Sequence, residues 1–138
     1  IQHDVTDNTL KVAATATGNE MATFKTTGLD VSGSINATGD ITAFHSSDER
    51  LKDNIQPIPN ALDKVLALTG NTFDWNDKSD HTGKDVGVIA QEVENVLPNI
   101  VTTRPDGYKA VKYDRIVALL IEAIKEQQQE IDWLKKQI

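Results

Sequence analysis

Ser47 and Lys52 lie five positions apart in the segment SDERLK, residues 47–52, and this pair could perform nucleophilic chemistry. A serine hydroxyl becomes a strong nucleophile when a neighbouring base removes its proton. A lysine can be that base once burial or a nearby cation brings its pKa from about 10.4 toward neutrality, which costs about 4–5 kcal/mol. Arg50 could supply the cation, and backbone N–H groups would form the oxyanion hole. On spacing alone, such a segment is by default a solvated charge cluster around a turn.

The other polar residues give weaker indications of a functional site. His3, His45 and His81 are scattered without partners at metal-ligand spacing, and the chain has no cysteine, so the sequence predicts no metal site. Glu92 falls on a short predicted helix, where it either faces solvent or orients a catalytic group. The sequence holds no phosphate-binding glycine loop and no nucleotide fingerprint, so no cofactor is expected.

Composition narrows the class of protein. The chain has 138 residues and a net charge of −7, which argues against a nucleic-acid surface and against attraction to anionic lipid. No apolar run approaches the roughly 20 residues that a membrane span requires. Apolar residues make up 38% of the chain, below the roughly 45–50% that is typical of globular domains. We therefore expect that part of the chain does not build a conventional core.

The first 45 residues contain no Pro, Trp, Tyr or Arg and carry a six-residue repeat. The residues that recur in phase are Leu29, Ile35 and Ile41; Val31, Ala37 and Ala43; and Gly33 and Gly39, while Leu10, Val12, Ala14 and Ala16 alternate with polar residues upstream. Short strands of this kind cannot bury a face alone and must stack on copies of themselves, along the chain or between chains. The alternative is a flexible linker. We predict that residues 1–46 are the end of a β-fibre stalk, with a boundary near His45-Ser46-Ser47.

Residues 47–138 hold all the prolines, tryptophans and tyrosines and have the pattern of a mixed α/β unit. The predicted elements are a helix that Asn60 caps and Gly70 ends, a strand at 71–75, a polar loop at 76–84, an apolar segment at 86–89 that runs into a helix at 90–97, and a hairpin of 100–103 and 108–113 around Pro-Asp-Gly.

The last predicted helix covers about residues 114–138 and carries a heptad pattern. Its a and d positions, which we call the seam, are Val117, Leu120, Ile124, Gln127, Ile131, Leu134 and Ile138. The first half of this helix is apolar on more than one face and can pack on its own domain. The second half has a narrow apolar stripe, which favours self-association through a coiled coil. A polar Gln127 layer lowers stability but can fix the register of the strands.

Three segments together resemble the endosialidase-type C-terminal intramolecular chaperone domain, a self-cleaving peptidase family of phage tail fibres, tailspikes and neck appendages. They are SDERLK with Asn54-Ile55 behind it, GVIAQEV at 87–93 with Leu97-Pro98, and YDRIVALLIEAIK at 113–125. The resemblance covers about residues 47–138. It implies a mixed α+β chaperone domain with a long C-terminal coiled-coil helix, preceded by a trimeric β-helical fibre segment.

The resemblance also implies a function. The domain is expected to form a homotrimer that holds three fibre strands in register, with its own N-terminal fibre as the folding client. It is then expected to release itself by autoproteolysis at the bond between Ser46 and Ser47. Carried onto this chain, Ser47 is the nucleophile and Lys52 the general base. Asp48 and Arg50 match the motif and are expected to hold its geometry.

The implied location is the host cytoplasm during assembly, with the fibre part in the virion tail or appendage and the chaperone domain released after cleavage. One alternative is a structural trimeric tip or receptor-binding head that is never removed. A second alternative, an uncleaved coiled-coil adaptor, leaves the pair of Ser47 and Lys52 unexplained.

Overall fold

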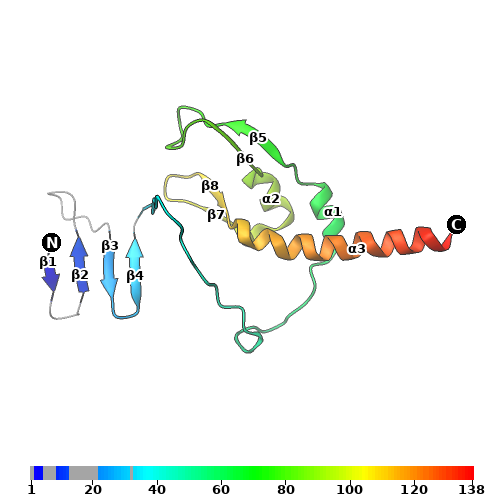
Figure 1. Cartoon of the computed structure of the whole chain (residues 1–138), viewed down its shortest axis with the longest axis horizontal. Helices are drawn as coiled ribbons and strands as arrows, with labels where there is room; N and C mark the ends of the chain where they lie inside the picture. The colour runs from blue at the N-terminus through cyan, green and yellow to red at the C-terminus, as the bar shows by residue number, and fades with distance from the viewer. Residues whose placement is uncertain (1, 5–8, 13–21, 32) are drawn as a thin grey trace. The chain divides into compact units, whose positions relative to one another are not determined.

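The structure is a computed structural model of the chain, and it describes residues 2–4, 9–12, 22–31 and 33–138. The chain forms two compact units, Ile1–Leu51 and Lys52–Ile138, which we call the N-terminal and C-terminal units. The boundary between them falls inside the SDERLK motif. Figure 1 shows the elements of both units.

The N-terminal unit contains a four-stranded antiparallel sheet in the order β1-β2-β3-β4. Its strands are β1 (Gln2–Asp4), β2 (Thr9–Val12), β3 (Ala22–Lys25) and β4 (Gly28–Val31). Phe24 pairs with Leu29 across β3 and β4, and both side chains are almost half exposed. These two side chains therefore present an apolar surface that a second layer of protein could cover.

The six-residue repeat only partly forms strands in the single chain. Leu29 and Val31 lie in β4 as predicted, whereas residues 33–46 contain neither helix nor strand. The strands predicted around Ile35 and Ile41 are thus absent from this structure, because a strand requires a hydrogen-bonding neighbour and none is paired with these residues here. Upstream, Leu10 and Val12 lie in β2, while the predicted alternation at 14 and 16 lies outside the described residues.

The C-terminal unit alternates short helices and hairpins before one long helix. Its elements are α1 (Ala61–Leu66), β5 (Asn71–Asp74), β6 (Lys84–Gly87), α2 (Ala90–Val96), the 3-10 helix η2 (Pro98–Ile100), β7 (Val101–Thr103), β8 (Lys109–Val111), the 3-10 helix η3 (Tyr113–Arg115) and α3 (Ile116–Lys136). The predicted mixed helix and strand composition is confirmed, with the C-terminal helix in place.

Three predicted boundaries in this unit differ from the structure. The sequence placed Lys84 in a loop, but residues 84–87 form β6, which pairs with β5 from Asp74 opposite Lys84 to Asn71 opposite Gly87. The first helix ends at Leu66, well before Gly70. The last helix begins at Ile116, after the 3-10 turn η3, and its 21 residues span about 31 Å at roughly 1.5 Å per residue.

The hairpin of β7 and β8 follows the turn that the sequence predicts. Arg104 donates a backbone hydrogen bond to Tyr108 (2.8 Å), and Gly107 donates one to Arg104 (2.9 Å). Gly107 has a φ of 87°, a left-handed conformation that glycine adopts without the steric cost of a Cβ atom. Asp106 accepts a hydrogen bond from the Tyr108 amide (2.9 Å) and fixes the far side of the turn.

The core of the C-terminal unit forms where α1 packs against α3 (Figure 1). Its buried residues are Ala61, Leu119 and Ala123, and the partly buried residues around them are Ile58, Leu62, Val65, Leu68 and Leu97. The small alanines on both helices allow a close approach of the two backbones. Val93 of α2 is also buried, at 1% exposure.

Candidate functional site

The SDERLK motif folds into a tight turn that Asp48 organises. Residues Glu49–Leu51 form the 3-10 helix η1, and Leu51 donates a backbone hydrogen bond to Asp48 (3.1 Å). The Asp48 carboxylate accepts hydrogen bonds from the Arg50 amide (2.9 Å), Arg50 Nε (3.0 Å) and Arg50 Nη2 (2.8 Å). Such a fork between a guanidinium and a carboxylate fixes both side chains in orientation as well as in distance.

This fork changes the role that the sequence suggests for Arg50. The hydrogen bonds to Asp48 raise the pKa of the Arg50 guanidinium above its ordinary value. The positive charge is therefore permanent, but Asp48 matches it with a negative charge at contact distance. This arrangement favours Arg50 as a positioning residue for the turn over Arg50 as the cation that activates a lysine.

The proposed nucleophile and base are at the surface of the single chain. Ser46 and Ser47 lie at the end of the N-terminal unit and are exposed, and Lys52 is the exposed first residue of the C-terminal unit. The roles that the sequence assigns to these three residues stay predictions. Because lysine acts as a base when burial or a cation disfavours its charged form, an exposed lysine would have to become buried or lie beside a cation to take this role.

His45 is a residue of this region to which the sequence patterns assign no catalytic role. Its Nδ1 lies 3.0 Å from the carbonyl oxygen of Ser46, which is the carbonyl of the bond proposed for cleavage. A carbonyl oxygen only accepts, so the imidazole nitrogen is the donor. No spacing rule signals a histidine at this position, because the contact depends on the backbone conformation between two adjacent residues.

Glu92 of α2 holds a loop in the C-terminal unit. Its carboxylate accepts hydrogen bonds from the Thr69 amide (2.9 Å) and, at 3.4 Å, from the Thr69 hydroxyl. Thr69 lies between α1 and β5, so Glu92 ties α2 to the start of the first hairpin. These contacts give Glu92 a structural role, and its support of the catalytic group stays a prediction.

The second and third signature segments meet at Gly87 and Tyr113. The Tyr113 hydroxyl oxygen accepts a hydrogen bond from the Val88 amide (3.2 Å). A Cβ atom on Gly87 would lie 2.5 Å from that same oxygen, which is closer than real contacts allow. A glycine at position 87 therefore allows the tyrosine of η3 to lie against the end of β6.

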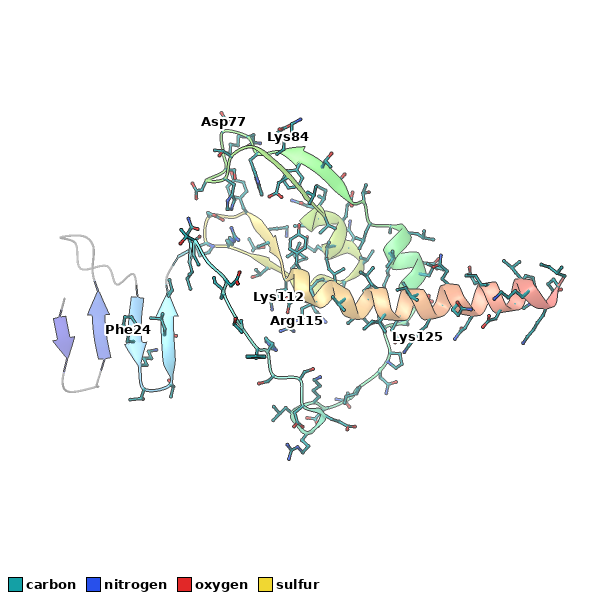
Figure 2. All side chains as sticks on the ribbon, viewed as in Figure 1. Phe24, Asp77, Lys84, Lys112, Arg115 and Lys125 are labelled. Atoms are coloured by element: carbon teal, nitrogen blue, oxygen red, sulfur yellow. The ribbon has the colours of Figure 1, made fainter. Side chains whose placement is uncertain are left out.

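The seam of α3 is on the outside of the C-terminal unit. Its six apolar residues are each at least 40% exposed, and Gln127 is exposed as well. A neighbouring face of the same helix carries Leu119 and Ala123, which are buried in the core with α1. Figure 2 shows side chains projecting along α3 past Lys125 toward its C-terminal end. A helix with one face in its own core and an apolar stripe left outside has a surface suited to a partner helix.

The N-terminus of α1 is capped from α3 by Glu126. Its Oε1 accepts from the Ala61 amide (2.9 Å) and its Oε2 from the Leu62 amide (2.8 Å). These backbone hydrogen bonds, first to Leu62 and then to Ala61, lower the pKa of the Glu126 carboxyl. The sequence predicted Asn60 as the cap, but Asn60 makes no side-chain cap and instead has a left-handed backbone with φ of 52°.

The described residues contain neither a metal-binding cluster nor a membrane-spanning helix. Within that part of the chain, no three His, Asp or Glu side chains are placed so that they could hold a metal ion. The described helices also include none that is long and apolar enough to cross a membrane.

Comparison with known proteins shows which family the middle of the chain resembles. Residues 47–102 match the sequence profile of the family described as chaperone of endosialidase, so this segment of the chain is similar to that family. The match begins at Ser47, the proposed nucleophile, and extends through α2 to β7.

The chain is also similar to long tail fibre proteins of phages. It is 41% identical over 101 residues to the long tail fiber protein Gp37 of Salmonella phage S16, which covers 67% of this chain and 14% of that protein. It is 41% identical over 88 residues to Gp37 of Enterobacteria phage K3, covering 57% of this chain and 7% of the relative. With Gp37 of Enterobacteria phage M1 it shares 39% identity over 97 residues, covering 64% and 38%. The chain thus spans well under half of the relatives that it matches.

Proposed function

We propose that residues 47–138 are an intramolecular chaperone that trimerises, sets the register of the β-fibre that ends with residues 1–46, and then releases itself by cutting the bond between Ser46 and Ser47. The observation that carries this proposal is the exposed seam of α3, which lies outside the core that the same helix forms with α1. The chaperone family of residues 47–102 and the similarity to long tail fibre proteins support the same role in fibre assembly.

The seam supports self-association on energetic grounds. Burying one large aliphatic side chain stabilises a complex by about 1.5–3 kcal/mol, and each protomer offers six apolar seam residues. The a positions Val117, Ile124, Ile131 and Ile138 are all β-branched, and this composition by itself fits either two or three helices. Family resemblance then favours three helices over two.

A chaperone of this kind would select the correct strand register in the fibre. A strand that slips by one residue sends its apolar side chains to the wrong face. The repeats around Leu29 and Ile35 differ little, so neighbouring registers are similar in energy. Residues 33–46 have no strand in the single chain, which fits a segment that pairs only with other chains. A trimeric C-terminal unit would join three such segments at one end, at an effective concentration of about millimolar.

The proposed cleavage is an acyl transfer followed by hydrolysis. Lys52 Nζ takes the proton of the Ser47 hydroxyl, and Ser47 Oγ bonds to the carbonyl carbon of Ser46 while the carbonyl π electrons move to oxygen. Collapse of this intermediate breaks the bond to the Ser47 nitrogen, which takes the proton back from Lys52. Water then hydrolyses the ester, leaving a carboxylate on Ser46 and restoring the Ser47 hydroxyl. The steps are the same whether the hydroxyl comes from the same chain or from a neighbouring protomer.

Assembly and cleavage have a natural order in this proposal. Ser47 and Lys52 are exposed in the single chain, and a lysine base needs burial or a cation beside it. Neighbouring protomers would supply that environment only after the trimer forms. Assembly takes place in the host cytoplasm. Cleavage then releases the chaperone domain and leaves the fibre part in the virion tail or appendage. Loss of the chaperone makes assembly irreversible in practice.

A second candidate function is a trimeric tip or receptor-binding head that remains attached to the fibre. The exposed position of Ser47 and Lys52 is the observation that favours it, because the lysine proposed as the base is not buried in the single chain. Both candidate functions require a trimer. They differ in whether the bond between Ser46 and Ser47 is cut.

Light scattering of the purified full chain, combined with a denaturing gel, tests both parts of the proposal. We expect the mass of three chains in solution and fragments of 46 and 92 residues on the gel. Ser47→Ala and Lys52→Ala should form the same trimer and stay full length, while the matched control Ser46→Ala should still be cut. A monomer would contradict the assembly role. A stable trimer of uncut wild-type chains would instead favour the attached tip.

A further inference from the structure

The imidazole of His45 lies against the carbonyl that the proposed cleavage attacks. We propose that His45 is a further catalytic residue of the self-cleavage, which donates a hydrogen bond from Nδ1 to the carbonyl oxygen of Ser46. This inference rests on the proposed function, because it gives His45 a role in that reaction alone. Neither the spacing of Ser47 and Lys52 nor the matched family segment, which starts at residue 47, includes this histidine.

The geometry suits an electrophilic role. The distance from Nδ1 to the Ser46 oxygen is 3.0 Å, within the ordinary range for an N–H to O hydrogen bond. The contact joins adjacent residues inside the N-terminal unit, so it forms without any contact from the C-terminal unit. Because the acceptor is a carbonyl, Nδ1 carries the hydrogen in the neutral ring, and Nε2 keeps the lone pair.

The donor gains importance as the reaction proceeds. When Ser47 Oγ bonds to the Ser46 carbon, negative charge develops on the oxygen that His45 contacts. A hydrogen bond to an oxyanion is stronger than one to a neutral carbonyl, so His45 stabilises the intermediate more than the starting peptide. His45 keeps its proton throughout, since the proton moves from Ser47 to Lys52 and then to the leaving nitrogen. Its task is therefore separate from that of the base.

Two substitutions at position 45 distinguish the effect of the hydrogen-bond donor from that of the aromatic ring. His45→Phe keeps an aromatic ring without the donor, and His45→Asn keeps an N–H group close to the position of Nδ1. The matched control is His81→Phe, because His81 lies against Trp75 in the C-terminal unit with ring centroids 5.0 Å apart, a contact that Phe preserves. The measurement is the first-order rate at which the assembled full chain is cut, followed on a denaturing gel with light scattering of the same samples.

We expect His45→Phe to be cut about 100-fold more slowly than wild type, the lower end of the effect of removing one oxyanion donor, because the contact is exposed. His45→Asn should recover most of that rate, and His81→Phe should match wild type. The inference is overturned if His45→Phe is cut at the wild-type rate, or if His45→Asn is as slow as His45→Phe. Wild-type chains that are never cut would overturn the proposed cleavage itself, and this inference with it.

Discussion

Arg50 donates three hydrogen bonds to Asp48, one from its backbone and two from its guanidinium, and these bonds set the turn that follows Ser47, the proposed nucleophile. Arg50→Lys keeps the charge but cannot reproduce the planar fork. Because misplacing a reacting group by about 1 Å can cost up to 100-fold, we expect the cleavage rate to fall about tenfold or more. The control is Glu49→Gln in the same turn. Equal rates for Arg50→Lys and wild type would show that the fork does not shape the motif.

Gly87 is the second residue whose identity has a direct physical reason. A Cβ atom there would lie 2.5 Å from the Tyr113 hydroxyl, so Gly87→Ala should lower the free energy of unfolding by about 1–3 kcal/mol. The matched control is Gly70→Ala, since a Cβ at Gly70 has nothing within 4 Å. Thermal denaturation followed by circular dichroism compares the two variants.

Tyr113→Phe should restore part of the stability lost in Gly87→Ala, because it removes the clashing oxygen. In the wild-type background the same change leaves the Val88 amide without its acceptor and should cost about 0.5–1.5 kcal/mol. Simple addition of the two losses in the double variant would contradict a direct contact between these positions.

At the residue scale, the sequence alone identified the parts that are local. The order of Ser47, Asp48, Arg50 and Lys52 is readable as a motif, and the Asp48 turn follows from short-range bonding. The contact of His45 with Ser46 was missed because it depends on one backbone conformation. The contact of Gly87 with Tyr113 was missed because it joins residues that are distant in the chain.

At the scale of elements, two faces of α3 have different roles, and two neighbouring leucines lie one on each face. Leu119 is 1% exposed in the core with α1, whereas Leu120 is 42% exposed on the seam. Leu119→Ala should therefore destabilise the C-terminal unit by about 2–5 kcal/mol.

Leu120→Ala should leave that unit folded and weaken the trimer instead. The pair of variants is compared by light scattering over a range of chain concentrations and by circular dichroism under the same conditions. Dissociation in Leu119→Ala with an intact fold, or unfolding in Leu120→Ala, would reverse the proposed assignment of the two faces.

Glu126 links α3 to α1 through a bond that depends on pH. The two backbone hydrogen bonds lower the pKa of the Glu126 carboxyl in the folded state. Its contribution to stability is therefore fully present above the unfolded value, about 4.3, and is lost as the pH falls through the lower folded value. Glu126→Gln should remove this part of the acid sensitivity.

The test is the difference in melting temperature between about pH 5 and about pH 3, measured for wild type and Glu126→Gln. Wild type should lose more stability over that interval than the variant. Glu130→Gln, an exposed change on the same helix one turn later, should behave as wild type. Equal acid sensitivity in wild type and Glu126→Gln would contradict the capping role.

At this scale the sequence predicted most helices and strands but not their long-range contacts. The start of α1 after Asn60 was right, yet the cap comes from Glu126, whose hydrogen bonds span 64 and 65 positions. β6 was missed because Lys84-Asp85-Val86-Gly87 lacks an apolar alternation, and its strand form depends on pairing with β5. The hairpin around Pro-Asp-Gly was predictable since its turn chemistry is local.

At the scale of the whole molecule, the repeat, the motif and the seam support one sequence of events. Residues 33–46 form no strand in the single chain, and the seam stays uncovered. Both features fit a protomer that completes its fold on meeting other copies. Neither sequence patterns nor a single chain can give the geometry between protomers, which is where the proposed base would be activated.

Intact-mass measurement of the assembled full chain tests the central claim most directly. We predict that wild type yields two masses, those of residues 1–46 and 47–138, while Ser47→Ala gives one uncut chain in the same oligomer. The second fragment should begin at Ser47, with water accounting for the mass added on cleavage. Wild-type trimers whose chains remain whole, or are cut at another bond, would contradict a chaperone that releases itself at Ser47.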